Sequence, residues 1–182
     1  GNAHQTNKKM YIVSNDGYWE NGNDMILGRV LKSKINLLNS CDWQFYKGGD
    51  GLLDANWGLE LSSAKPFLVN PGKLSMSGVQ YNEPLKKYLM IQWYYTNGSG
   101  HLAPTDSTWL FYESPTPWGP WKEFGSQKFP NDGYYSPAFA PKFISPDGLK
   151  LVIFTNGNFM THAKPGDECR YRLTQIPCTL KV

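Results

Sequence analysis

One hairpin-like segment occurs three times in this chain, and this repeat limits the possible folds more than any other feature. In each copy, lysine starts a run of β-branched and aromatic residues that stops at a tight-turn signal containing Asn and Gly. The runs start at Lys8, Lys86 and Lys150 and reach Asn15, Asn97 and Asn156. Such self-similarity predicts repeated units of antiparallel strands.

Further strand-like runs surround each copy of the hairpin. Runs follow it at 25–30, 108–113 and 170–176, short aromatic segments come next at 43–46 and 121–124, and runs precede two copies at 74–81 and 136–144. Each unit is therefore expected to contain about four antiparallel strands.

Four-stranded units that recur along a chain are typical of β-propeller blades. We expect a single partial propeller with blade units at 8–46, 74–124 and 136–182. The 15% aromatic residues, 18 Gly and 13 Pro suit short strands joined by tight turns. An ordinary β-sandwich whose strands merely look alike is the alternative.

The number of units has a consequence, because a propeller needs about 4–8 blades to close. This chain supplies about three, and the first lacks its innermost strand. We therefore expect the C-terminal part of a longer propeller, which packs against missing N-terminal blades or a partner chain.

Composition excludes several function classes. The net charge of +3 is too small and dispersed for a nucleic-acid partner. No apolar run is long enough for a membrane span. Neither phosphate-binding loops nor metal-ligand spacings occur, so we expect no cofactor and no metal. Cys41, Cys169 and Cys178 leave three possibilities open, which are free thiols, one disulfide with a free thiol, or a disulfide between Cys41 and a further part of the protein.

Several segments carry a family resemblance that covers most of the chain. They are Leu27-Gly-Arg-Val30, Trp43-Gln-Phe-Tyr46, Tyr81 to Met90, Tyr112 to Trp121, Tyr135-Ser-Pro137 and Lys142 to Gly148. With them, the chain resembles the five-bladed propellers of the glycoside hydrolase clan that includes family 43. It is more similar to domain-of-unknown-function family 4185, whose members are linked to endo-D-arabinanase activity. The resemblance implies a secreted or cell-surface protein that binds and degrades a polysaccharide.

Strand order predicts which loops share one end of the blades. In a four-stranded meander, the loop that enters the first strand and the turn between the second and third strands lie at the same end. The loops expected at this end are 15–24, 47–73, 96–107, 125–135 and 155–168. Aromatic rings there can stack on sugars and polar groups can bind hydroxyls, or they can simply pack the loops. The substrate-binding candidates are Trp19, Trp57, Ser77, Gln80, His101, Tyr134, Tyr135 and His162.

Glycoside hydrolysis normally requires two carboxyl groups, one of them acting as the acid. In hydrolases that this chain resembles, they project from the starts of innermost strands into a central pocket. Asp132 precedes such a strand and is the leading catalytic candidate, followed by Asp16 and Asp24, although all three also flank turns. Other essential acids are expected in the missing blades. The alternatives are a propeller that binds carbohydrate without cleaving it and a propeller that binds proteins.

Overall fold

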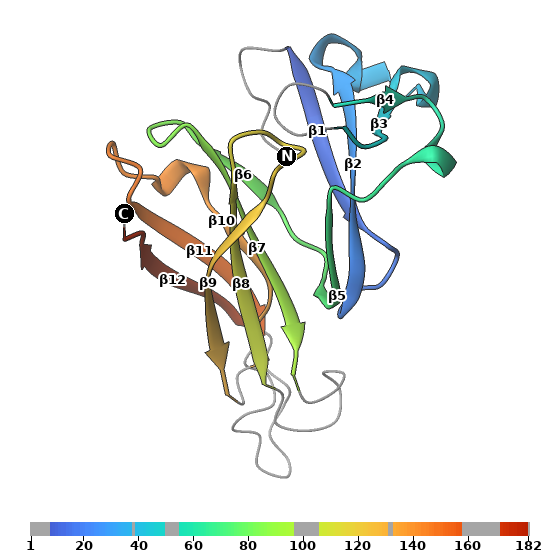
Figure 1. The fold of residues 1–182 in the computed structure, drawn as a ribbon. Helices are drawn as coiled ribbons and strands as arrows, with labels where there is room; N and C mark the ends of the chain where they lie inside the picture. The colour runs from blue at the N-terminus through green and yellow to red at the C-terminus, as the bar shows by residue number, and fades with distance from the viewer. Residues whose placement is uncertain are drawn as a thin grey trace.

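A computed structural model describes residues 8–37, 39–49, 55–96, 106–130, 133–157 and 172–181. This part of the chain is all-β and forms three antiparallel sheets (Figure 1). Its helices are short 3-10 segments: η1 Lys32–Leu37, η2 Ser40–Asp42, η3 Leu61–Ser63 and η4 Pro141–Phe143. No helix in these ranges combines the length and apolar character needed to cross a membrane.

The first sheet has one strand that pairs with three others. Its strands are β1 Lys9–Asn15, β2 Gly22–Leu31, β3 Gln44–Tyr46, β4 Trp57–Gly58 and β5 Leu68–Leu74. The pairing order is β1-β2-β3-β4, and β5 pairs with the beginning of β2. β1 pairs with β2 along its whole length, from Lys9 opposite Leu31 to Asn15 opposite Met25.

The second and third sheets follow the predicted units closely. The second sheet is a meander of β6 Val79–Asn82, β7 Lys87–Tyr95, β8 Ser107–Ser114 and β9 Lys122–Phe129. The third sheet contains β10 Tyr135–Phe139, β11 Lys150–Gly157 and β12 Arg172–Thr179. The predicted antiparallel unit of four strands is therefore confirmed in the second sheet.

The turns that lead into the repeated strands share one geometry. Before β7, the Lys86 amide donates to the Glu83 carbonyl at 3.3 Å, and before β11 the Gly148 amide donates to the Ser145 carbonyl at 2.8 Å. Both closing residues have positive φ, +54° and +77°, and so does Lys8 before β1, at +54°. Because this conformation is uncommon outside Gly, its recurrence supports a repeated structural unit.

The predicted strand over 74–81 is wrong, because Leu74 and β6 belong to different sheets. Leu74 ends β5 and pairs with Gly22 of the first sheet. Between the two strands, the Ser75 amide donates to Gln92 Oε1 at 2.9 Å and the Ser75 hydroxyl to the Trp93 carbonyl at 2.5 Å. Side-chain partners therefore take the place of a continuous ladder at this crossing.

Two further expectations differ from the structure. The strand predicted over 136–144 ends at Phe139, where η4 begins with Pro141, a residue without an amide hydrogen for the ladder. The segment 47–73, expected as a loop, contains β4, η3 and most of β5. The first sheet thus extends beyond the predicted boundary at residue 46.

The second sheet lies between the other two (Figure 1). Strand alternation gives β7 two buried faces. Toward the third sheet, Leu89, Ile91, Trp93 and Tyr95 pack with Trp109, Phe139, Leu151 and Ile153. Toward the first sheet, Met90 packs with Leu110 and Tyr112, against the partly buried Phe67 and Leu68. The sheets therefore form a face-to-face stack.

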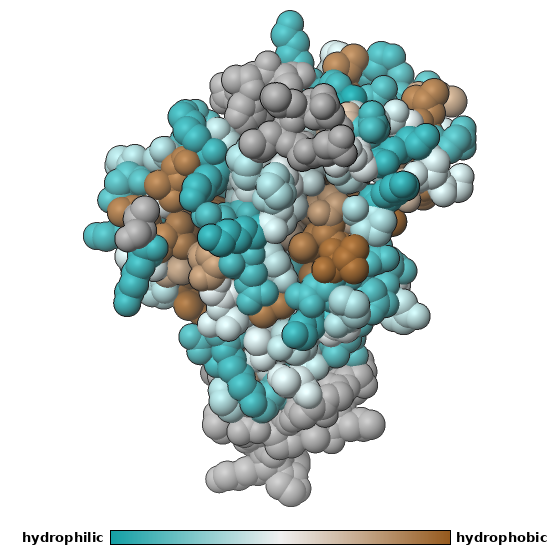
Figure 2. All heavy atoms as spheres, in the orientation of Figure 1, coloured by the Kyte–Doolittle hydropathy of each residue, from teal (hydrophilic) through white to brown (hydrophobic). Residues whose placement is uncertain are grey.

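The outer face of the first sheet keeps apolar side chains at the surface. Ile12 is 53% exposed and Val69 is 59% exposed. Figure 2 shows exposed hydrophobic side chains in several separate patches, with polar side chains between them. Two described cysteines are free thiols: Cys41 is exposed, whereas Cys178 lies half-buried in β12. Cys169 lies outside the described residues.

Candidate functional site

Aromatic side chains from the loop after β1 and from the second and third sheets meet at one end of the stack. We call Trp19, Trp93, Tyr95 and Tyr135 the aromatic cluster. The Trp19 ring centroid lies 5.2 Å from that of Trp93 and 5.3 Å from that of Tyr135, both in edge-on geometry. The ring of Tyr95 lies 5.1 Å from Trp93 and 6.2 Å from Trp19. The loop after β1 and the strands β7 and β10 thus build one site.

Exposure divides the aromatic cluster into a base and a rim. Trp93 is 0% exposed and Tyr95 is 2% exposed, whereas Trp19 remains 40% exposed. The Trp93 indole donates a hydrogen bond to the Met76 carbonyl at 3.0 Å, which fixes the ring. The cluster therefore offers a ring on a rigid support, which suits stacking against the apolar face of a sugar.

Asn21 fixes the loop that carries Trp19. Its side-chain nitrogen donates to the Tyr95 carbonyl at 3.0 Å, and its side-chain oxygen accepts from the Tyr95 amide at 2.9 Å. Its own amide donates to the Ser75 hydroxyl at 3.0 Å. The first sheet is thereby hydrogen-bonded to the second directly beside the aromatic cluster.

Asp16 lies in the same loop and is held by Asn23. One carboxylate oxygen accepts from the Asn23 amide at 3.1 Å and from its side-chain nitrogen at 2.9 Å. The other oxygen, Oδ1, is buried and has no hydrogen-bond partner. A Cβ at Gly22 would lie 2.4 Å from this oxygen and 2.7 Å from the Leu74 carbonyl oxygen, so only glycine fits there.

Asp24 lies apart from the aromatic cluster. It is in β2 opposite Val69, whereas its neighbours Met25 and Leu68 are on the other face of the sheet. Successive residues of a strand alternate between faces, so Asp24 points away from the second sheet. Asp24 is therefore not part of the aromatic cluster.

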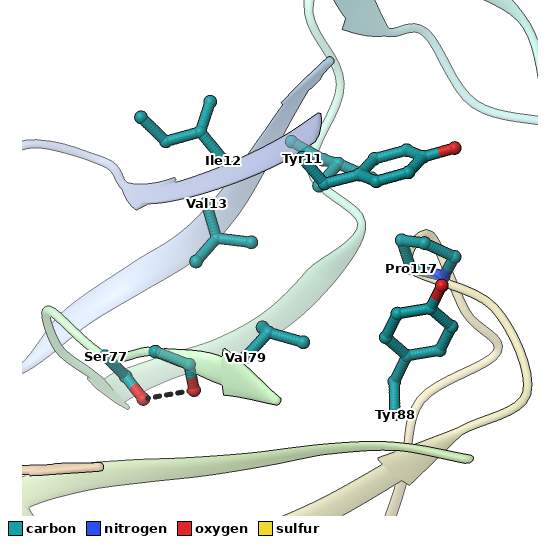
Figure 3. Close-up of a pocket in the computed structure, with 9 residues that line it drawn as sticks. Tyr11, Ile12, Val13, Ser77, Val79, Tyr88 and Pro117 are labelled. Carbon is teal, nitrogen blue, oxygen red and sulfur yellow. Dashed lines mark hydrogen bonds between the residues drawn. The ribbon is translucent and has the colours of Figure 1, made fainter. Parts of the chain in front are cut away.

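Gln80 lies in β6 and Ser77 lies just before it, near the junction of the first and second sheets. Ser77 lines a cavity of about 140 Å³ together with Val13, Val79 and Tyr88 (Figure 3). The Ser77 hydroxyl donates to the Ile91 carbonyl. Gln80 is 7% exposed, and its amide nitrogen donates to the Tyr81 carbonyl at 2.6 Å. Both side chains therefore already bind the backbone.

Burial changes the chemistry of the tyrosine in this cavity. The pKa of Tyr88 lies well above its ordinary value, first because burial disfavours the phenolate and then because of the nearby Tyr11, Tyr81 and Glu83. The side chains of Val13 and Val79 project into the same space (Figure 3). The cavity is thus suited to apolar groups and to neutral hydroxyls.

The other aromatic candidates lie away from Trp19. Tyr134 packs against Phe129, with ring centroids 5.2 Å apart, and its carbonyl accepts from the Trp109 indole at 3.4 Å. Trp57 packs against Tyr46 at 5.8 Å in the first sheet. The structure thus joins only Trp19 and Tyr135 of the predicted aromatic residues.

Three candidates fall outside the described residues, namely His101, Asp132 and His162. Among the residues that are described, no group of three or more His, Cys, Asp and Glu side chains is arranged to hold a metal ion.

Sequence reasoning missed Trp93, Asn21 and Ser75, although all three build the site. Trp93 lies inside a continuous apolar run, and nothing in that run distinguishes a residue at the end of a sheet stack. Asn21 resembles any other loop asparagine until its contacts with Tyr95 are seen. No protein-family model and no curated protein matches this sequence, so the family resemblance remains a prediction.

Proposed function

We propose that this chain is part of a glycoside hydrolase-like five-bladed propeller that binds and hydrolyses a polysaccharide. Binding takes place at the aromatic cluster, and two carboxyl groups perform hydrolysis in a central pocket. Some of these carboxyl groups lie in further blades. The observation that carries the proposal is the meeting of Trp19, from the loop between β1 and β2, with Trp93 and Tyr135, from the second and third sheets, at one end of the stack.

The edges and faces of the first sheet support the proposed further blades. In the described part of the chain, β1 pairs only with β2, whereas the matching strands β7 and β11 have partners on both sides. The exposed Ile12 and Val69 lie on the face that no described sheet covers. An added strand would pair with this edge, and an added blade would cover these side chains.

A calorimetric titration with arabinan oligosaccharides tests the binding site. Trp19→Ala is expected to weaken binding by about 1–3 kcal/mol, because a stacked aromatic contact is lost. Phe124→Ala is the matched control, since Phe124 is 42% exposed against 40% for Trp19 and lies on the outer strand β9. Equal affinities for both variants and the unaltered protein would remove the aromatic cluster from substrate binding.

Hydrolysis is tested separately in the complete protein. Asp132→Asn is expected to abolish the release of reducing ends while oligosaccharide binding is retained, because an amide cannot act as acid or base. Asp16→Asn is the second variant, since Asp16 has a buried carboxylate oxygen without a hydrogen-bond partner. Unchanged turnover in either variant removes that residue from the mechanism.

A carbohydrate-binding propeller without catalysis is the second candidate. It is favoured by the position of Asp24, which points away from the aromatic cluster. This candidate predicts that the complete protein binds oligosaccharides, that binding depends on Trp19, and that no cleavage occurs.

A further inference from the structure

A second open cavity lies at the opposite end of the first sheet from the aromatic cluster. Its volume is about 360 Å³, which is within the range of small-molecule sites. Lys9 and Arg29 line it from paired strands, since Lys9 is opposite Leu31 and Arg29 is two residues earlier in β2. Lys34, Asp42 and Gln44 also line it. We call this cavity the cationic cavity.

Positive charge predominates there. Three cationic side chains line the cavity, and Asp42 is the one carboxylate among the lining residues. Asp42 already pairs with Lys34, with the two charged atoms 2.5 Å apart. The described lining therefore carries two positive charges in excess, which favours an anionic ligand.

Arg29 is held in place by neutral groups. Its guanidinium carbon lies 3.7 Å from the ring centroid of Trp57, and its Nε donates to Gln44 Oε1 at 2.9 Å. None of the ion pairs found among the described residues includes Arg29. Arg29 also forms a hydrogen bond with the Tyr11 hydroxyl. Because a guanidinium has five N–H donors, these two bonds leave further donors to bind a ligand in the cavity.

The titration behaviour of the two cations agrees with this geometry. Burial lowers the pKa of Arg29, and the Tyr11 hydroxyl partly offsets this effect. Burial and then the charge of Arg29 lower the pKa of Lys9. A bound anion would relieve both effects, because opposite charge stabilises the charged form of each side chain.

We propose that the cationic cavity binds an oxyanion through the Arg29 guanidinium, with Lys34 and Lys9 providing further positive charge. Phosphate, sulfate and carboxylate each present neighbouring oxygen atoms, which a guanidinium can bind with two parallel hydrogen bonds. Val30, Leu31 and Leu59 line the rest of the cavity, so the oxyanion can be carried on a small carbon skeleton.

Calorimetric titrations of the whole chain test the proposal at constant ionic strength, so that screening is matched. The probes are inorganic phosphate, sulfate and glucuronate, with glucose as the neutral counterpart of glucuronate. We expect at least one anion to bind and glucose not to bind. Tighter binding of glucuronate assigns the site to an acidic sugar, and tighter binding of phosphate or sulfate assigns it to a free anion. Failure of all three anions to bind overturns the proposal.

Variants then locate the site. Arg29→Gln is expected to weaken anion binding by about tenfold or more, in line with loss of a charge-assisted hydrogen bond. Lys122→Gln is the matched control, because it removes the same charge from an exposed position in β9. Unaltered affinity in Arg29→Gln, or equal losses in both variants, overturns the proposal.

Arg29 also packs in the sheet, so its variant is checked by circular dichroism. If Arg29→Gln does not fold, the exposed Lys34 is replaced instead. Lys34→Gln must then weaken anion binding by about threefold or more. An unchanged affinity in that variant overturns the proposal.

Discussion

The two faces of the second sheet pack in different ways. Toward the third sheet, eight buried apolar residues, including Ile91 and Trp93, form one continuous cluster. Toward the first sheet, the buried residues form two smaller clusters, one around Leu27 and the other around Met90. Hydrogen-bonded polar pairs and a cavity of about 140 Å³ accompany these clusters.

The interface with the third sheet therefore contributes more to stability, and the interface with the first sheet adapts more easily. A continuous apolar cluster excludes water and stabilises the fold through the apolar area that it buries. An interface with polar pairs depends on hydrogen-bond geometry as well as on burial. Loss of one hydrogen bond therefore changes the relative position of the two sheets more than it changes how compactly they pack. The aromatic cluster joins both interfaces, because Trp93 and Tyr135 belong to one side and Trp19 to the other.

Neighbouring substitutions in β7 give the largest expected effects. Ile91 and Met90 are both 0% exposed but lie on opposite faces. Ile91→Ala is expected to lower the free energy of unfolding by about 2–5 kcal/mol, and Met90→Ala is expected to fall at the lower end of the same range. The buried cluster around Met90 is smaller and lies beside polar groups, so neighbouring side chains can move into the space left by the substitution more easily. Equal losses in urea titrations would contradict the comparison.

Asn21→Gly tests the polar connection between the first two sheets. Glycine accepts the positive φ of Asn21, +53°, so the variant removes the side chain without adding backbone strain. Loss of its two hydrogen bonds to Tyr95 is expected to cost about 1–2 kcal/mol and to speed amide exchange at Tyr95. The control is Asn56→Ala, at an exposed position. Unchanged exchange at Tyr95 would show that Asn21 does not hold the loop.

Alkaline pH is expected to weaken the interface between the first and second sheets more than the interface between the second and third sheets. Burial raises the pKa of Tyr46, Tyr88 and Tyr112, all of which lie on this side. Above the ordinary tyrosine pKa of about 10, the unfolded chain ionises while the folded chain keeps its protons, so stability falls as pH rises. Tyr88→Phe should reduce this fall between pH 9 and pH 11 in urea titrations. An unaltered slope would show that Tyr88 ionises freely in the folded state.

The smallest expected effect concerns an ion pair in the second sheet. Lys87 and Glu113 lie 2.9 Å apart, with side chains 45% and 29% exposed. Glu113→Gln is expected to cost less than about 1 kcal/mol, because solvent screens an exposed pair. A larger loss in thermal unfolding would show that charge, and not only apolar burial, holds this part of the stack.

The sequence predicted the strands better than it predicted their partners. The repeated runs became β1, β7 and β11, because a lysine start, an apolar run and a tight turn are local signals. Leu74 was placed in the wrong sheet, since pairing with Gly22 depends on residues 52 positions away in the chain. Trp19 and Tyr135 were predicted as site residues, and the structure places them together. Trp57 was predicted on the same ground, as an aromatic residue in a loop at that end of the blades, but its ring packs against Arg29 instead.

By itself, the sequence determined that this chain forms antiparallel β-units, because alternation and turn residues act over a few neighbouring positions. Only the tertiary structure decided that an indole from the first sheet meets aromatic rings of the second and third, and that Arg29 faces a cavity with excess positive charge. Both arrangements depend on how whole sheets stack, and stacking is fixed by the summed burial of many side chains far apart in the chain.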